Sequence, residues 1–145
     1  MGNLVLNGQT VFEQVGTSRP TFGDGYPNGY AVPIQLLSNL VTYENSWADY
    51  GNEWSPTIVR SFDNYVTING IVTGGSNGTR VCTMPEGWKP YSNVLTIQMS
   101  EGNTFQRVDI RVDGVYDGEL WVMADGIRAG TSWIALTMHY LAVSA

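Results

Sequence analysis

Apolar and polar residues alternate along most of the chain, which predicts short β-strands. From Val41 onward, runs with a period of two are separated by Gly, Asn and Asp, and a helical period is hard to find. The runs with this alternation are LVTYE, TIVRSF, YVTINGIV, TRVCTM, VLTIQMS, FQRVDIRVDG, GELWVMA and SWIALTMHYL. About eight short strands joined by turns predict an all-β fold, a jelly-roll-like antiparallel β-sandwich.

Successive side chains of a strand point to opposite faces, so each run can be divided into two sides. YVTINGIV has Val66, Ile68 and Val72 on one side. VLTIQMS places Leu95, Ile97 and Met99 opposite Val94, Thr96, Gln98 and Ser100. FQRVDIRVDG has an apolar side of Val108, Ile110 and Val112 and a charged side, expected to face solvent, of Arg107, Asp109, Arg111 and Asp113.

The last two runs are apolar on both sides. The inward side should carry Leu120, Val122 and Ala124 in one run, and Ile134, Leu136, Met138 and Tyr140 in the other. The other side then carries Trp121 and Met123, followed by Trp133, Ala135, Thr137 and His139. A strand buried on both sides in a two-layer sandwich needs an outer partner, so we expect a subunit contact there. A glycan platform and a misassigned register are the alternatives.

The N-terminal part of the chain differs in composition from the rest. Residues 1–38 contain RPTFGDGYPNGY, where Gly, Pro and polar residues disfavour both helix and long strand. We expect an extended arm or neck over residues 1–38 and one β-sandwich domain over residues 39–145.

Charge narrows the classes of partner. Only 14% of the 145 residues are charged, against about a quarter in a typical globular domain. Part of the surface is therefore expected to be covered by a partner or by copies of the chain. The net charge of −6 argues against nucleic acid and anionic membrane, because an acidic surface gains nothing from either. We find neither an apolar run long enough to span a bilayer nor a signal-peptide pattern.

The sequence offers little for metal or cofactor chemistry. Cys82 is the single cysteine and His139 the single histidine, which excludes an intrachain disulfide and multi-histidine zinc sites. Cys82 is expected to be a small apolar residue in a strand. DIRVDGVYDGEL mimics a calcium loop, but Arg111 occupies a ligand position, so at most a looser calcium site remains, made by Asp113, Asp117 and Glu119. We expect no cofactor and no bound metal.

Five carboxylates lie close together in the sequence, namely Asp109, Asp113, Asp117, Glu119 and Asp125. A glycosidase needs two such groups across a sugar. Three of the five precede Gly in Asp-Gly pairs, however, which are typical of hairpin turns. His139 lies within a strand run and no Gly-x-Ser-x-Gly elbow is present. We therefore expect that the protein is not an enzyme.

The stretch MPEGWKPYS, residues 84–92, predicts a stiff turn. Pro85 cannot donate to a strand ladder, Gly87 can adopt a positive φ, and Pro90 fixes the exit of the chain. We expect Trp88 to cover an edge of the core rather than to bind a ligand, and Tyr91 to do the same.

Two sets of motifs resemble those of phage tail proteins. GTSRPTFGDGYPNGY is similar to a motif of tail and neck proteins, although the Phe-Asp-Thr-Thr that often follows is missing. Residues 41–145 resemble the receptor-binding tip domain of phage tail fibres, through the apolar-Pro-x-Gly-aromatic-x-Pro segment 84–90 and the closing strand 133–136. The resemblance implies a homotrimer in the virion tail fibre or tail tip. It further implies upstream fibre or tail proteins as neighbours and a host cell-surface polysaccharide or other glycan as receptor.

The residues that we predict to contact a glycan lie on the last hairpin and are Trp121, Asp125, Arg128, Trp133 and His139. They combine stacking surface with donors and acceptors for sugar hydroxyls. A simpler interpretation is that Asp125 and Arg128 only shape the GIRAG loop. Two other functions stay open: a structural tail domain without receptor binding, and an independent carbohydrate-binding (lectin) module.

Overall fold

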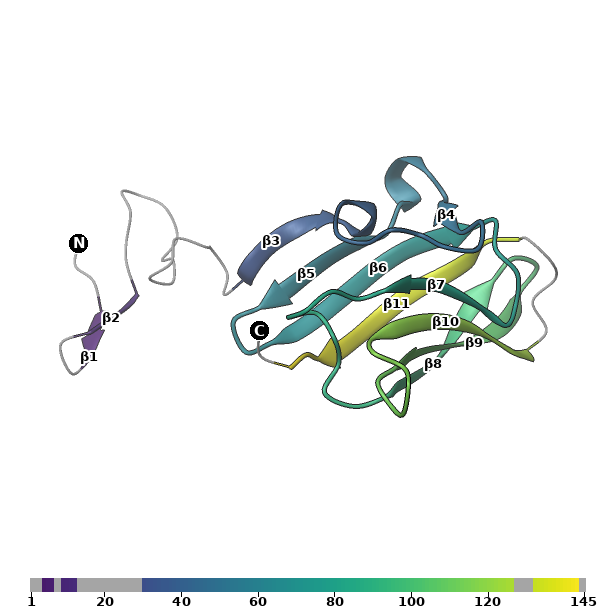
Figure 1. Ribbon diagram of the computed structural model, residues 1–145. Coiled ribbons are helices and arrows are strands. Elements are labelled where there is room, and N and C mark those ends of the chain that lie inside the picture. Colours follow the sequence, from purple (N-terminus) through teal and green to yellow (C-terminus); the bar gives the residue numbers. More distant parts are fainter. Residues whose placement is uncertain (1–3, 7–8, 13–29, 127–131, 144–145) are drawn as a thin grey trace.

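The computed structural model describes residues 4–6, 9–12, 30–126 and 132–143. It confirms the all-β fold, with antiparallel strands in a curled sheet (Figure 1). The strands are β1 (Leu4–Leu6), β2 (Gln9–Phe12), β3 (Tyr30–Leu36), β4 (Ala48–Asp49), β5 (Thr57–Ser61), β6 (Tyr65–Thr73), β7 (Thr79–Thr83), β8 (Val94–Ser100), β9 (Thr104–Arg111), β10 (Glu119–Gly126) and β11 (Ile134–Leu141). The 3₁₀ helices η1 (Leu37–Asn39) and η2 (Asn52–Trp54) are too short to cross a membrane, and the described residues contain no helix that could.

The main sheet has the strand order β3-β5-β6-β11-β8-β9-β10-β7, with β4 paired to β6 outside this path, while β1 pairs with β2. The sheet bends where β11 meets β8, because their register contains the single pair Ile134 and Ser100. The bend divides it into a first half, β3-β5-β6-β11, and a second half, β8-β9-β10-β7. Figure 1 shows β7 and β10 passing in front of β11, so the two halves form the layers of a jelly-roll-like sandwich.

The core lies between the two halves and is built from alternate positions of their strands, except in β7, where the consecutive residues Val81 and Cys82 are both buried. The first half contributes Ile58, Val66, Ile68, Val72, Ile134, Leu136, Met138 and Tyr140, and the second half Val81, Cys82, Val108, Ile110, Leu120 and Val122. The inward sides predicted for the YVTINGIV and SWIALTMHYL runs are therefore confirmed. Cys82 is fully buried in β7, as expected for a small apolar residue.

The turn after β7 has the structural role predicted for Trp88. Gly87 has φ 82°, and the indole of Trp88 is only 7% exposed. The backbone N–H of Trp88 donates to the carbonyl of Pro85 over 3.0 Å, and the hydroxyl of Tyr140 donates to the carbonyl of Trp88 over 2.7 Å. The guanidinium of Arg60 lies 5.7 Å from the centre of the indole ring and donates to the carbonyl of Gly87 over 2.8 Å. The turn is thus fixed to the core from two strands.

Tyr91, which we expected to cover the core edge like Trp88, is 74% exposed, so that expectation is wrong. Its backbone N–H donates to the carbonyl of Leu141, and Pro90 forms an isolated bridge with Ala142. These backbone contacts hold the chain alongside the end of β11 and leave the phenol outside.

The predicted strand LVTYE is not a strand. Leu40 and Val41 close the turn of η1, where the N–H of Val41 donates to the carbonyl of Leu37 over 3.0 Å. Glu44 makes one ladder-like bond to Val81, but Asn45 and Ser46 then have positive φ and turn the chain away. The sheet gains β3 instead, which pairs with β5. β3 lies within the segment expected to form the arm, and the domain boundary near residue 38 stays a prediction.

Two assignments of faces are also corrected. Ala124 is exposed rather than part of the core, because the pairing of β10 with β9 shifts after Val122. Asp109 is on the outer side as predicted, yet it is only 2% exposed, because the guanidinium of Arg107 covers it.

Candidate functional site

The outer side of the first half presents a surface of exposed polar and aromatic side chains. We call it the polar-aromatic face and define it as Tyr65, Thr67, Asn69, Thr137 and His139. The pairing of β6 with β11 places His139 directly opposite Thr67 and Thr137 opposite Asn69. All five side chains are exposed, while the residues between them in each strand point into the core. Strand alternation therefore gathers these side chains on one surface.

Contacts within the polar-aromatic face hold its side chains in place. The rings of Tyr65 and His139 are stacked, with centroids 4.9 Å apart and planes 2° from parallel. Nδ1 of His139 lies 2.9 Å from the hydroxyl of Thr67, and the hydroxyl of Thr137 donates to Oδ1 of Asn69 over 3.4 Å. The imidazole and the amide each have a second polar atom for a ligand hydroxyl. Ordered ring surface next to donors and acceptors suits a neutral polyhydroxyl ligand.

The outer side of the second half carries a contiguous apolar surface. We call it the apolar stripe and define it as Leu95, Ile97, Met99 and Phe105. Their side chains are 63%, 75%, 51% and 52% exposed, in that order. Met99 pairs directly with Phe105 across β8 and β9. The sides of the VLTIQMS run are therefore as predicted, but its apolar side faces outward and its polar side faces the interior.

A network of hydrogen bonds explains why the polar side of β8 faces inward. Gln98 is 4% exposed and lies at the bend, beyond the single backbone pair between β8 and β11. Its amide nitrogen donates to the carbonyl of Thr137 and its amide oxygen accepts the N–H of Thr137, each over 3.0 Å. The side chain thus completes the hydrogen bonding of a β11 residue that β8 backbone does not reach, which a buried polar group requires.

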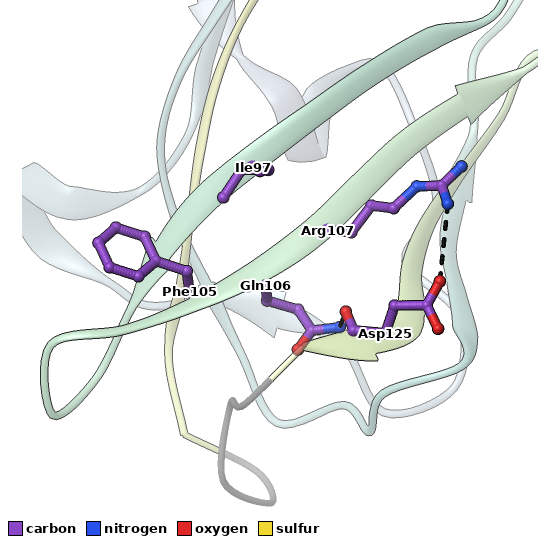
Figure 2. A pocket seen from close by; sticks show the side chains of 5 residues that line it. All are labelled: Ile97, Phe105, Gln106, Arg107 and Asp125. Atoms are coloured by element: carbon purple, nitrogen blue, oxygen red, sulfur yellow. Dashed lines mark hydrogen bonds and ion pairs between the residues drawn. The ribbon is translucent and has the colours of Figure 1, made fainter.

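Two shallow hollows lie beside Ile97 on the outer side of β8 and β9. One has a volume of about 340 Å³ and is lined by Leu95, Thr96, Ile97 and Arg107. The other has a volume of about 300 Å³ and is lined by Ile97, Phe105, Gln106, Arg107 and Asp125. In Figure 2 the phenyl ring of Phe105 points away from Arg107, and Gln106 is directed towards β10.

Charges around these hollows are paired within the chain. The guanidinium of Arg107 binds both carboxylate oxygens of Asp109, over 3.0 and 2.7 Å, and lies 3.6 Å from the carboxylate of Asp125 (Figure 2). Arg111 makes the same two-bond contact with Asp113, over 3.2 and 2.9 Å. Both carboxylates raise the pKa of the guanidinium that they bind. The border of the apolar stripe is thus polar, with two cations and three carboxylates that nearly balance.

The remaining acidic residues of this region are bound by cations as well. Asp117 accepts from Lys89 over 2.9 Å, and Glu119 accepts from Arg80 over 2.7 Å and from the indole of Trp121 over 2.8 Å. Gly114 and Gly118 have the positive φ expected of Asp-Gly turns. Among the described residues, no three His, Cys, Asp or Glu side chains gather as a metal site would require.

The residues predicted to bind glycan are separated by the fold. His139 belongs to the polar-aromatic face, whereas Trp121 and Asp125 lie on β10, on the outer side of the second half. Trp121 is half-buried and packs edge-to-face against Tyr116, with centroids 6.1 Å apart. Trp133 is half-buried just before β11, where its carbonyl accepts from the N–H of Glu101 over 3.2 Å. Arg128 lies outside the described residues.

Sequence reasoning missed Tyr65 and the apolar stripe. Tyr65, Thr67 and Asn69 alternate on the polar side of the YVTINGIV run, and this signal could have led to the polar-aromatic face. The register that brings His139 beside Thr67 joins residues 72 positions apart and cannot be read from either run alone.

A search for related proteins found no matching family model and no matching curated protein. The observations that bear on function are therefore the geometry of the two outer faces and the motifs of the sequence.

Proposed function

We propose that this protein is the receptor-binding tip domain of a phage tail fibre, which acts as a homotrimer and attaches the virion to a glycan of the host cell surface. The observation that carries the proposal is the polar-aromatic face on β6 and β11, with its stacked Tyr65 and His139. The segments 84–90 and 133–136 support it through their resemblance to tip domains, and a jelly-roll-like sandwich is compatible with that resemblance.

A neutral glycan is the ligand class that fits the polar-aromatic face best. Tyr65 offers ring surface to the C–H face of a sugar, while Asn69, Thr67 and His139 offer hydrogen-bonding groups to its hydroxyls. The chain carries a net charge of −6, which disfavours a strongly anionic polysaccharide. A site of exposed side chains on one sheet face binds one sugar weakly, and three copies on a fibre raise the overall strength of attachment by avidity.

Binding to immobilised host polysaccharides tests the proposal, with Tyr65→Ala and His139→Ala as variants. Each should weaken binding about tenfold, because loss of one aromatic contact costs about 1.4 kcal/mol. Tyr50→Ala is the matched control, since Tyr50 is 49% exposed and its backbone N–H bonds the carbonyl of Ile71, at the other end of β6 from Tyr65. If all three variants bind polysaccharide as tightly as the wild-type protein, the polar-aromatic face is not the glycan site.

The apolar stripe favours a second candidate, a structural tail domain that contacts only other virion proteins. Exposed apolar surface suits protein contacts better than sugar hydroxyls. Adsorption of the purified protein to host cells distinguishes the two functions: saturable adsorption that competes with intact phage supports the receptor-binding domain, and lack of adsorption to every host tested supports the structural domain.

A further inference from the structure

The apolar stripe faces outward because the interior side of β8 is committed to specific bonds. A one-residue shift of β8 would move Gln98 to the surface and turn Leu95, Ile97 and Met99 inward. That shift would remove both bonds between the Gln98 amide and the Thr137 backbone. It would also remove the bond from the Thr96 hydroxyl to the Val108 carbonyl, over 2.7 Å. The outward position of the stripe is therefore built into the fold.

The border of the stripe indicates the charge of the partner. Among the residues that the structure describes, Arg107 and Arg111 are the cations beside it, and each forms a two-bond contact with a carboxylate, Asp109 or Asp113. Asp125 lies 3.6 Å from Arg107 and lines one hollow, so the two cations face three carboxylates and this surface carries one excess negative charge. The whole chain has a net charge of −6, and two copies repel unless they meet through a neutral surface. The surface around the stripe is close to that condition, with one excess negative charge.

The shape of the stripe is compatible with a copy of itself. Ile97 is the most exposed of its four side chains, at 75%, and lines both hollows. Hollows of about 340 and 300 Å³ lie beside this projecting side chain. The same surface therefore carries both an apolar projection and spaces that could receive one. In a ring of identical copies each copy can offer the projecting side chain to one neighbour and a hollow to the other, so a surface with both parts suits a cyclic homo-oligomer.

We propose that copies of this chain associate through the apolar stripe, with Ile97 of one copy entering a hollow beside Ile97 of the next. The number of copies, three, rests on the proposed function, whereas the choice of surface rests on the stripe alone. This contact lies on β8 and β9, whereas the sequence pattern predicts a subunit contact on the outer sides of β10 and β11.

Light scattering coupled to size exclusion, applied to the full chain over a wide range of concentrations, tests this surface. The wild-type protein should have the mass of an oligomer, and Ile97→Lys should shift the mass to that of a monomer. A lysine at the centre of an apolar contact should weaken association at least about a hundredfold, since central apolar contacts dominate interface energetics. Val115→Lys, at a side chain 91% exposed in the β9–β10 connection, is the matched control and should leave the mass unchanged.

Circular dichroism confirms that each variant is folded, and Met99→Lys, on the same stripe, replaces Ile97→Lys if the latter does not fold. A monomeric wild-type protein at the highest concentration, or a folded Ile97→Lys protein with the wild-type mass, overturns the proposal. Binding of the same samples to host polysaccharide separates the two proposals. If the wild-type protein is an oligomer but binds no glycan, only the receptor function is overturned. If it is a monomer and binds glycan, only the contact through the apolar stripe is overturned.

Discussion

The side chain of Gln98 bonds both backbone groups of Thr137, donating to its carbonyl and accepting its N–H over 3.0 Å each. The two residues lie at the bend where β8 and β11 part after one backbone pair. An amide has the same donor and acceptor as a peptide unit, so Gln98 takes the place of a missing neighbour in the ladder. This contact joins the two halves of the sandwich and sets the face on which β8 shows its apolar residues.

Replacement of Gln98 by Ala should destabilise the fold by about 2 to 4 kcal/mol, because two buried backbone groups of Thr137 lose their partner. The free energy of unfolding, measured in denaturant, checks this value. Met99→Ala is the control, since Met99 is the next residue and is half exposed. Similar stability of the Gln98→Ala and wild-type proteins would mean that Thr137 does not depend on this amide.

Removal of the Trp88 indole should cost about 3 to 5 kcal/mol, the usual effect of replacing a buried tryptophan by Ala. Trp88 is 7% exposed, whereas Trp54 is 56% exposed and serves as the control for the loss of an indole. Thermal unfolding of Trp88→Ala and Trp54→Ala should therefore differ by many degrees. Equal melting temperatures would contradict a structural role for the turn.

A side chain at position 75 should be poorly tolerated for steric reasons. A Cβ built on Gly75 lies 2.0 Å from the indole of Trp47, whose Nε1 donates to the hydroxyl of Thr79 over 2.9 Å. Gly75→Ala should destabilise by about 1 to 3 kcal/mol, the range for overpacking in a core. At Gly102 a Cβ meets open space and only the φ of 75° is unfavourable, so Gly102→Ala should cost about 1 kcal/mol.

Cys82 should make the fold sensitive to alkali. Burial raises the pKa of its thiol from 9.0 to about 12, so the folded state keeps a proton that the unfolded chain loses above pH 9. Between these values the unfolded state binds fewer protons, and stability should fall by up to about 1.4 kcal/mol per pH unit. Burial also raises the pKa of Tyr43 and Tyr140, which adds to this loss at higher pH.

Unfolding in denaturant at pH 7, 9, 10 and 11 checks the expected fall in stability. Cys82→Ala removes the thiol and should flatten the decline between pH 9 and 10, before the tyrosines of the unfolded chain lose their protons. An identical pH dependence in the wild-type and Cys82→Ala proteins would show that the thiol does not contribute.

Local pattern was enough to find most strands and the role of Trp88. The period of two located β5 through β11, because each of those strands turns one side to the interior, although β8 buries Gln98 and Ser100 there instead of apolar residues. It failed at LVTYE, where the alternation is present but Asn45 and Ser46 adopt positive φ and end the extended chain. The alternation also could not show which side of β8 faces the interior, because Gln98 is held inward by the backbone of Thr137, 39 positions away.

The candidate site could be predicted only in part. His139 was named from its residue type and strand, but its stacking partner Tyr65 lies at the start of another strand and depends on the long-range register. Trp121 and Asp125 were grouped with His139 because all lie near the end of the chain. The bend between β11 and β8 instead places them on the other half of the sandwich.

Thr137 has its hydroxyl on the polar-aromatic face, and its backbone is bonded to Gln98, whose chain neighbours Ile97 and Met99 belong to the apolar stripe. Thr137 of β11 and Gln98 of β8 therefore connect the surface proposed for the receptor directly to the surface proposed for self-association. A Gln98 variant that lost both glycan binding and self-association would show only that the junction of β8 and β11 is damaged. Variants that separate the two surfaces should therefore be made at residues that contact neither Gln98 nor Thr137.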